Sequence, residues 1–201
     1  MNKFKQHSGI IAPLNISNID TDSIIPKQFL QHVTREGFGQ YLFHDWRFLD
    51  SQRKKENYDF ILNKEYYRNS SILLARNNFG CGSSREHAVW ALMDYGFKVI
   101  IAVSFADIFY NNSFNNHLLL ITLTEQEIDN IFSVVHENLG ITCYVSLKYN
   151  KVIINNKEYF FSIPCFHRFC LLNGLDSIDL TMNNQDLIKN YEKNIPNFFI
   201  R

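Results

Sequence analysis

The residues best suited to chemistry lie in one short stretch, Asn78-Phe79-Gly80-Cys81-Gly82-Ser83-Ser84-Arg85-Glu86-His87-Ala88. It combines two glycines, two hydroxyls, a guanidinium and an imidazole. An apolar run of strand length precedes it at 71–75, and apolar residues recur at helical spacing from Ala88 until Gly96. The stretch is therefore predicted to connect a strand to a helix, where free backbone N–H groups and the helix dipole favour a bound carboxylate or phosphate.

A purely structural role is the main alternative for this stretch. Ser83 and Glu86 have the spacing of a capping box, in which the serine would only bind a backbone amide of the helix. Such a cap requires neither a second serine, Ser84, nor Arg85. A dinucleotide-binding fingerprint would need glycine in place of Arg85, and a Walker A loop would need a lysine before its hydroxyl. The planar guanidinium of Arg85 instead suits a carboxylate.

Composition indicates an ordinary globular protein. The chain has 201 residues, of which 46% are hydrophobic and 15% aromatic, enough for one domain spanning 1–201 with extensions. Twenty basic and twenty acidic residues cancel, so we expect neither nucleic acid nor a membrane surface as a partner. Apolar runs long enough for a signal peptide or a membrane span are missing from the sequence, which predicts a cytoplasmic protein.

Cysteine and histidine spacing predicts no metal ligands in this chain. The four cysteines form no CxxC pair, and the seven histidines form neither HxH nor HExxH. Free thiols are the expected state of Cys81, Cys143, Cys165 and Cys170.

Alternating strand and helix patterns surround the stretch. After the helix that ends at Gly96, apolar runs at 98–103 and 118–123 predict two more strands, and Thr124 with Glu127 forms a capping box that opens a helix to about Asn138. This order is typical of an α/β domain with a parallel sheet.

The C-terminal third returns to strands and then to helices. Short strands are predicted at 143–147, 151–154 and 159–163, followed by a helix from Pro164 through 172 and another at 185–193. We therefore expect an α/β fold with a mixed, largely parallel sheet, flanking helices and a small antiparallel β appendage. A charged, glycine-containing excursion at about 31–57 is predicted to be partly mobile, and 164–201 to form a helical extension.

Four separated blocks resemble one known family. They are Asp20-Thr21-Asp22-x-Ile24-Ile25-Pro26, the stretch at 78–88, Ser104-Phe105-Ala106-Asp107-Ile108-Phe109 with Asn111-Asn112-Ser113, and Leu171-Leu172-Asn173-Gly174-Leu175-Asp176. In this order they resemble the small subunits of bacterial 3-isopropylmalate dehydratases and cover nearly the whole chain. The resemblance implies the swivelling β/β/α domain of the aconitase type.

The resemblance also implies an activity, a cofactor and a partner. Enzymes of this family are hydro-lyases that convert 2-isopropylmalate, a dicarboxylate, to 3-isopropylmalate through isopropylmaleate in leucine synthesis. A [4Fe-4S] cluster, carried by a separate large subunit, would act as the Lewis acid. This chain would be active only with that large subunit.

Residue roles follow from the same resemblance. Ser83 would act as an alkoxide base, and Arg85 would clamp a substrate carboxylate. The backbone amides of Gly82 and Ser84 would bind substrate and stabilise developing negative charge. Arg35 is a candidate on its position alone: it lies in a glycine-flanked candidate lid at 34–39 that would contact the substrate side chain, and the alternative is a solvated loop arginine.

Asp22 and His87 are expected to support the site, with His87 either orienting the loop or pairing with Asp22. Each also has a structural alternative, since Asp22 could make an Asx-turn and a histidine near a helix start is commonly structural. His117 stands where the family pattern has glycine, which predicts an unfavourable backbone angle. Other aconitase-type small subunits, of homoaconitase or citraconate hydratase, remain alternatives, as does a noncatalytic anion-binding assembly subunit.

Overall fold

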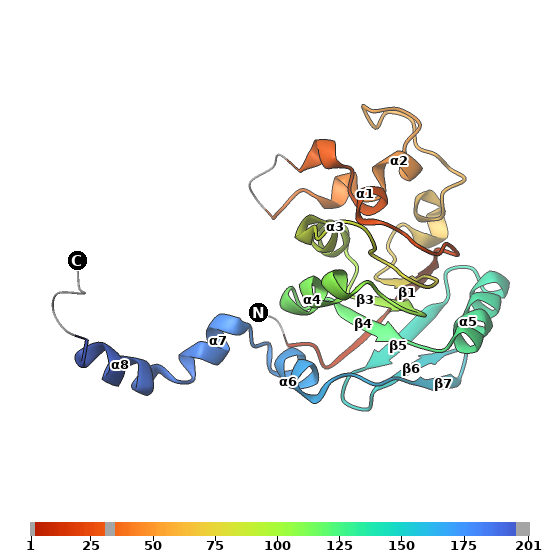
Figure 1. The fold of residues 1–201 in the computed structure, drawn as a ribbon. Coiled ribbons are helices and arrows are strands. Elements are labelled where there is room, and N and C mark those ends of the chain that lie inside the picture. The colour runs from red at the N-terminus through yellow and green to blue at the C-terminus, as the bar shows by residue number, and fades with distance from the viewer. Residues whose placement is uncertain (1–2, 31–34, 196–201) are drawn as a thin grey trace.

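The computed structural model describes residues 3–30 and 35–195, and its centre is one seven-stranded sheet in the order β4-β3-β2-β1-β5-β6-β7 (Figure 1). The strands are β1 (Gln6–Pro13), β2 (Ile72–Leu74), β3 (Val99–Ala102), β4 (Leu119–Thr122), β5 (Thr142–Ser146), β6 (Lys151–Ile154) and β7 (Lys157–Phe160). Strands β1 to β4 are parallel, and β5, β6 and β7 continue the sheet with antiparallel pairing. The predicted mixed sheet is therefore confirmed, and the antiparallel ribbon is part of it.

Strand β1 joins the two halves of the sheet. Its first part pairs antiparallel with β5, from Gln6 to Ile10, and its last part pairs parallel with β2. The sequence did not predict this strand, because only its second half is an apolar run. Burial follows the same division, since β1 becomes fully buried only from Ile11 onward.

Helices cover both faces of the sheet (Figure 1). The α-helices of the described residues are α1 (Thr21–Ile24), α2 (His44–Arg47), α3 (Glu86–Tyr95), α4 (Asp107–Asn115), α5 (Glu125–Glu137), α6 (Cys165–Asn173), α7 (Ser177–Met182) and α8 (Gln185–Lys193), of which α7 and α8 do not cover the sheet. Helices α3 and α4 contact one another on one side, and α5 lies on the other. The sequence predicted α3, α5, α6 and α8 but not the polar α4 or the short α7, and it placed β7 two residues too late.

Helix α5 shows how local sequence and packing agree. Its predicted capping box is present, with the Thr124 N–H donating to the Glu127 carboxylate over 2.9 Å. Ile128, Ile131 and Val135 recur at helical spacing and are fully buried. Burying each such side chain stabilises the fold by about 1.5–3 kcal/mol.

The described part of the predicted excursion is built onto the end of α3. Phe38, Leu42 and Phe43 are fully buried, and the Asp94 carboxylate of α3 accepts the Gly39 N–H over 2.7 Å. Glycine is required here, since a Cβ at Gly39 would lie 2.5 Å from the backbone of α3. Mobility of the excursion stays a prediction, and residues 31–34 lie outside the described part.

The C-terminal extension divides into two parts. Helix α6 packs on the body through Cys170 and Leu171 and ends at Gly174, whose φ of 70° forms a left-handed cap. Helices α7 and α8 then lead away from the body (Figure 1). Within the described residues, none of the helices has the length and apolar character needed to cross a membrane.

Candidate active site

The predicted strand-to-helix turn is confirmed, but its serine does not cap the helix. Strand β2 ends at Leu74, and α3 begins with Arg85 at its N-cap position, where no side chain makes a capping bond. Ser83 lies two residues before that cap, and its carbonyl accepts the Arg85 N–H over 2.8 Å. Ser83 and Ser84 are both exposed. The capping-box alternative is therefore wrong, and the Ser83 side chain faces solvent.

Two glycines give the turn its path. Gly80 has a φ of +78°, and a Cβ there would lie 2.2 Å from the Phe109 ring of α4. Gly82 has a φ of +87° with more room, since a Cβ would lie 3.5 Å from Asp20. Gly80 therefore brings the backbone against α4, whereas Gly82 mainly supplies the left-handed angle.

The Asp20-Thr21-Asp22 block is bonded directly to this turn. The Thr21 N–H donates to the Cys81 carbonyl over 2.9 Å, and the Thr21 hydroxyl donates to the Ser83 carbonyl over 3.1 Å. Asp20 caps α1 by accepting the Ser23 N–H over 2.6 Å. The Asx-type role considered for Asp22 thus belongs to Asp20, which leaves the Asp22 carboxylate available for another partner.

That partner is Arg85. Its Nη1 donates to Asp22 Oδ1 in an ion pair between side chains that are 18% and 46% exposed, respectively. Within the described residues, this is the one recorded polar contact of the Arg85 side chain. The pair uses one edge of the guanidinium, so its remaining donors can bind a second carboxylate.

The third block holds the turn from the other side. Ser104, just after β3, accepts the Asn78 N–H on its hydroxyl at 2.8 Å and the Phe79 N–H on its carbonyl at 3.1 Å. Ala106 N–H donates back to the Phe79 carbonyl over 3.0 Å. The anchoring roles of Ser104 and Thr21 were not predicted, although both lie in blocks that the resemblance identified.

His87 does not form the suggested pair with Asp22. Its ring packs against Phe38 and Trp90, at centroid distances of 5.4 Å and 4.7 Å. Its ring therefore contacts the excursion through Phe38, which agrees with the structural alternative.

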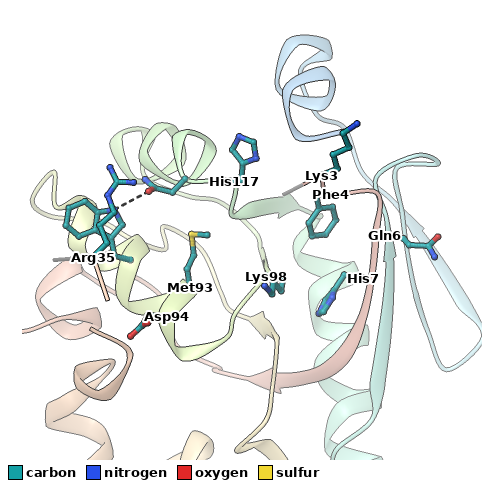
Figure 2. A pocket seen from close by; sticks show the side chains of 11 residues that line it. Lys3, Phe4, Gln6, His7, Arg35, Met93, Asp94, Lys98 and His117 are labelled. Carbon is teal, nitrogen blue, oxygen red and sulfur yellow. Dashed lines mark hydrogen bonds between the residues drawn. The ribbon is translucent and has the colours of Figure 1, made fainter. Parts of the chain in front are cut away.

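Arg35 lies at a separate cavity of about 550 Å³ (Figure 2). Its guanidinium sits 5.0 Å from the centre of the Trp90 ring. His7 and Lys98, which also line the cavity, lie at the starts of β1 and β3, whereas the turn follows the end of the parallel strand β2. Neither Ser83 nor Arg85 lines it. The structure thus brings together Asp22, Gly82, Ser83, Ser84 and Arg85 but not Arg35. A role for Arg35 in substrate binding stays a prediction. Thr34, the first residue of the candidate lid, lies outside the described residues.

Comparisons with known proteins show which family the chain belongs to. The model of the aconitase C-terminal domain matches residues 1–126, which include the first three blocks. A 3-isopropylmalate dehydratase small subunit from Buchnera aphidicola subsp. Diuraphis noxia is 62% identical over 100% of this chain and 96% of the relative. The chain belongs to this small-subunit family of the aconitase type.

Further relatives of the small-subunit family support the assignment. A 3-isopropylmalate dehydratase small subunit from Buchnera aphidicola subsp. Pterocomma populeum is also 62% identical, over 100% of this chain and 97% of its own length. A crystal structure of 3-isopropylmalate dehydratase from Methanocaldococcus jannaschii has a TM-score of 0.65 at 26% identity, covering 93% of this chain and 99% of that one. The predicted swivelling-domain fold of the aconitase type is confirmed.

Proposed function

We propose that this chain is the small subunit of a 3-isopropylmalate dehydratase and supplies the base and carboxylate clamp of its active site. The relatives that match its full length bear that name. The observation that carries the proposal is the exposed Ser83 hydroxyl two residues from the Arg85–Asp22 ion pair, on a turn bonded to two other blocks. An exposed hydroxyl on the same short turn as a cation, at a helix start, suits proton transfer next to a carboxylate.

The turn has separate parts for charge and for proton transfer. In dehydration, Ser83 Oγ, as an alkoxide, takes the proton from the carbon beside a substrate carboxylate, and hydroxide leaves from the neighbouring carbon. In hydration, hydroxide adds to the carbon that lost its proton, and Ser83 returns the proton to the neighbouring carbon, which regenerates the alkoxide. Arg85 binds a carboxylate with the donors that Asp22 leaves free, and the Gly82 and Ser84 amides stabilise the alkoxide.

A large subunit completes the site in this proposal. We assign the [4Fe-4S] cluster to that subunit on the family resemblance; when bound, the cluster would supply the Lewis acid for the leaving hydroxyl. Among the described residues of this chain, no three His, Cys, Asp or Glu side chains form a group that could hold a metal ion. The exposed face of the turn is where a second chain would enclose the substrate.

Substitution of Ser83 tests the proposal. Ser83→Ala, assembled anaerobically with the large subunit and an intact cluster, should lower kcat for 2-isopropylmalate by about 10² to 10⁴-fold. Ser84→Ala is the matched variant: its role uses the backbone N–H, so turnover should stay within about threefold. Near-normal turnover of Ser83→Ala would refute the base assignment and favour a noncatalytic subunit. Parallel assays with homocitrate and citraconate separate the related hydro-lyases.

A further inference from the structure

The C-terminal arm, defined as residues 177–194, carries large apolar side chains that the body does not cover. Four are exposed over about half their surface or more: Ile178 at 69%, Met182 at 49%, Leu187 at 69% and Tyr191 at 73%. The arm leads away from the sheet (Figure 1). Such a concentration of exposed apolar residues in one segment indicates a binding surface.

Among the described residues, the hydrogen bonds of the arm join its own residues or connect it to Asp176 and Ile195 at its two ends. Asp176 and Asp179 form a capping box at the start of α7, and the amide of Asn194 donates to the Asn190 carbonyl at the end of α8. Every hydrogen bond recorded for the described residues of the arm stays within 176–195. Helices of 6 and 9 residues are marginal in water without an apolar surface to pack on.

The faces of α8 indicate what kind of surface the arm fits. Leu187 and Tyr191 lie one turn apart on one face, and Asp186, Lys189 and Lys193 lie on the opposite face. The polar face carries both signs of charge, whereas helices that bind lipid surfaces are rich in Lys and Arg. The arm is therefore suited to an apolar groove on a protein.

The matches to known proteins point to the occupant. The aconitase C-terminal domain model ends at residue 126, so the arm lies outside the matched part. Relatives that are named as separate small subunits align over all of this chain, including the arm. A domain that forms a subunit of its own must be held to the rest of the enzyme by noncovalent contacts.

We infer that the arm docks into an apolar groove on the large subunit through Ile178, Met182, Leu187 and Tyr191. This inference rests on the proposed function, because it takes its partner from there. The arm then acts as a tether that keeps the Ser83 turn at a high effective concentration near the large subunit. It contributes to affinity and contributes no group to the reaction.

A pair of matched double variants tests the tether. Leu187→Ser with Tyr191→Ser changes the apolar face, and Asp186→Ser with Lys189→Ser changes the opposite face while leaving net charge unaltered. Binding of each full-length chain to the purified large subunit is measured anaerobically by fluorescence titration, and turnover is measured at saturating large subunit. The apolar-face variant should raise Kd at least about tenfold, with kcat unchanged, and the control should match the unsubstituted chain.

Each other outcome has a distinct meaning. Equal Kd values for the apolar-face variant and the unsubstituted chain would overturn the inference. Self-association through the arm would also overturn it: the chain alone would form dimers, the apolar-face variant would be monomeric, and the Kd for the large subunit would be the same for both. Tight, arm-dependent binding without turnover in the unsubstituted complex would refute the catalytic proposal and support the tether, so the two failures are distinguishable. Melting temperature checks that the body stays folded.

Discussion

Arg85 and Asp22, 63 residues apart in the sequence, form an ion pair that joins the turn before α3 to the block at 20–26. Asp22 is nearly half exposed, so the pair adds little to stability. Its effect is to fix the direction of the Arg85 guanidinium. A cation held in one orientation binds a carboxylate without first losing its rotational freedom.

Asp22→Asn should therefore impair catalysis more than folding. Removing the charge that orients Arg85 is expected to lower kcat/KM by up to about 100-fold, measured in the enzyme reconstituted with its large subunit. Asp129→Asn is a matched control, since Asp129 forms a similar pair with Arg76, at exposures of 55% and 21%. Equal losses for the two variants would contradict a specific role for Asp22.

Gly80→Ala should destabilise the chain strongly. It introduces both an unfavourable positive φ and a Cβ 2.2 Å from the Phe109 ring, at a cost of about 2–4 kcal/mol. Gly82→Ala keeps the angle penalty but has room for the methyl group, so it should cost only about 1 kcal/mol. Urea unfolding of the two variants measures the difference, and similar midpoints would refute the steric account.

His7 should make stability depend on pH in the mildly acidic range. Burial lowers the pKa of His7 from its ordinary value of 6.5, and the nearby Lys98 charge lowers it further. The unfolded chain then binds more protons than the folded one, so stability falls as pH drops below about 6.5. His7→Gln should flatten the urea midpoint between about pH 7 and 5. Burial also lowers the pKa of His167, so part of the dependence should remain.

The Lys98 contribution can be measured separately. Lys98→Gln removes the positive charge and should move the pKa of His7 upward, toward its ordinary value, in an NMR titration. Lys148→Gln, a lysine that does not contribute to this shift, is the control. No movement with Lys98→Gln would leave burial as the whole cause.

The cysteines should differ sharply in alkylation. Burial raises the pKa of the Cys143 thiol to about 12 and that of Cys170 in the same direction, whereas Cys165 is exposed. Iodoacetamide at pH 8 should modify Cys165 in the folded chain and leave Cys143 unmodified, as read by mass spectrometry. Rapid labelling of Cys143 without denaturant would show that strand β5 opens.

His117 illustrates where a sequence pattern predicted backbone geometry correctly. The resemblance placed it at a position for glycine, and its φ is +63°. A ring nitrogen 3.1 Å from the Leu175 carbonyl ties the residue to the end of α6. The unfavourable angle is thus accompanied by a contact that glycine could not make.

The sequence by itself determined the turn before α3, the parallel βαβ core and the family. Glycine positions and apolar periodicity are short-range patterns, and the order of the four blocks can be followed directly along the chain. It could not determine β1, whose two halves pair with different strands, or α4, whose polar sequence becomes helical against α3 and β4. Only the tertiary structure decided that Ser83 is not a cap, that Asp22 pairs with Arg85 while His87 packs on Phe38, and that Arg35 lies at another cavity. The last three depend on side chains brought together from distant parts of the chain, and packing of the sheet and helices fixes that proximity. Local sequence spacing does not record it.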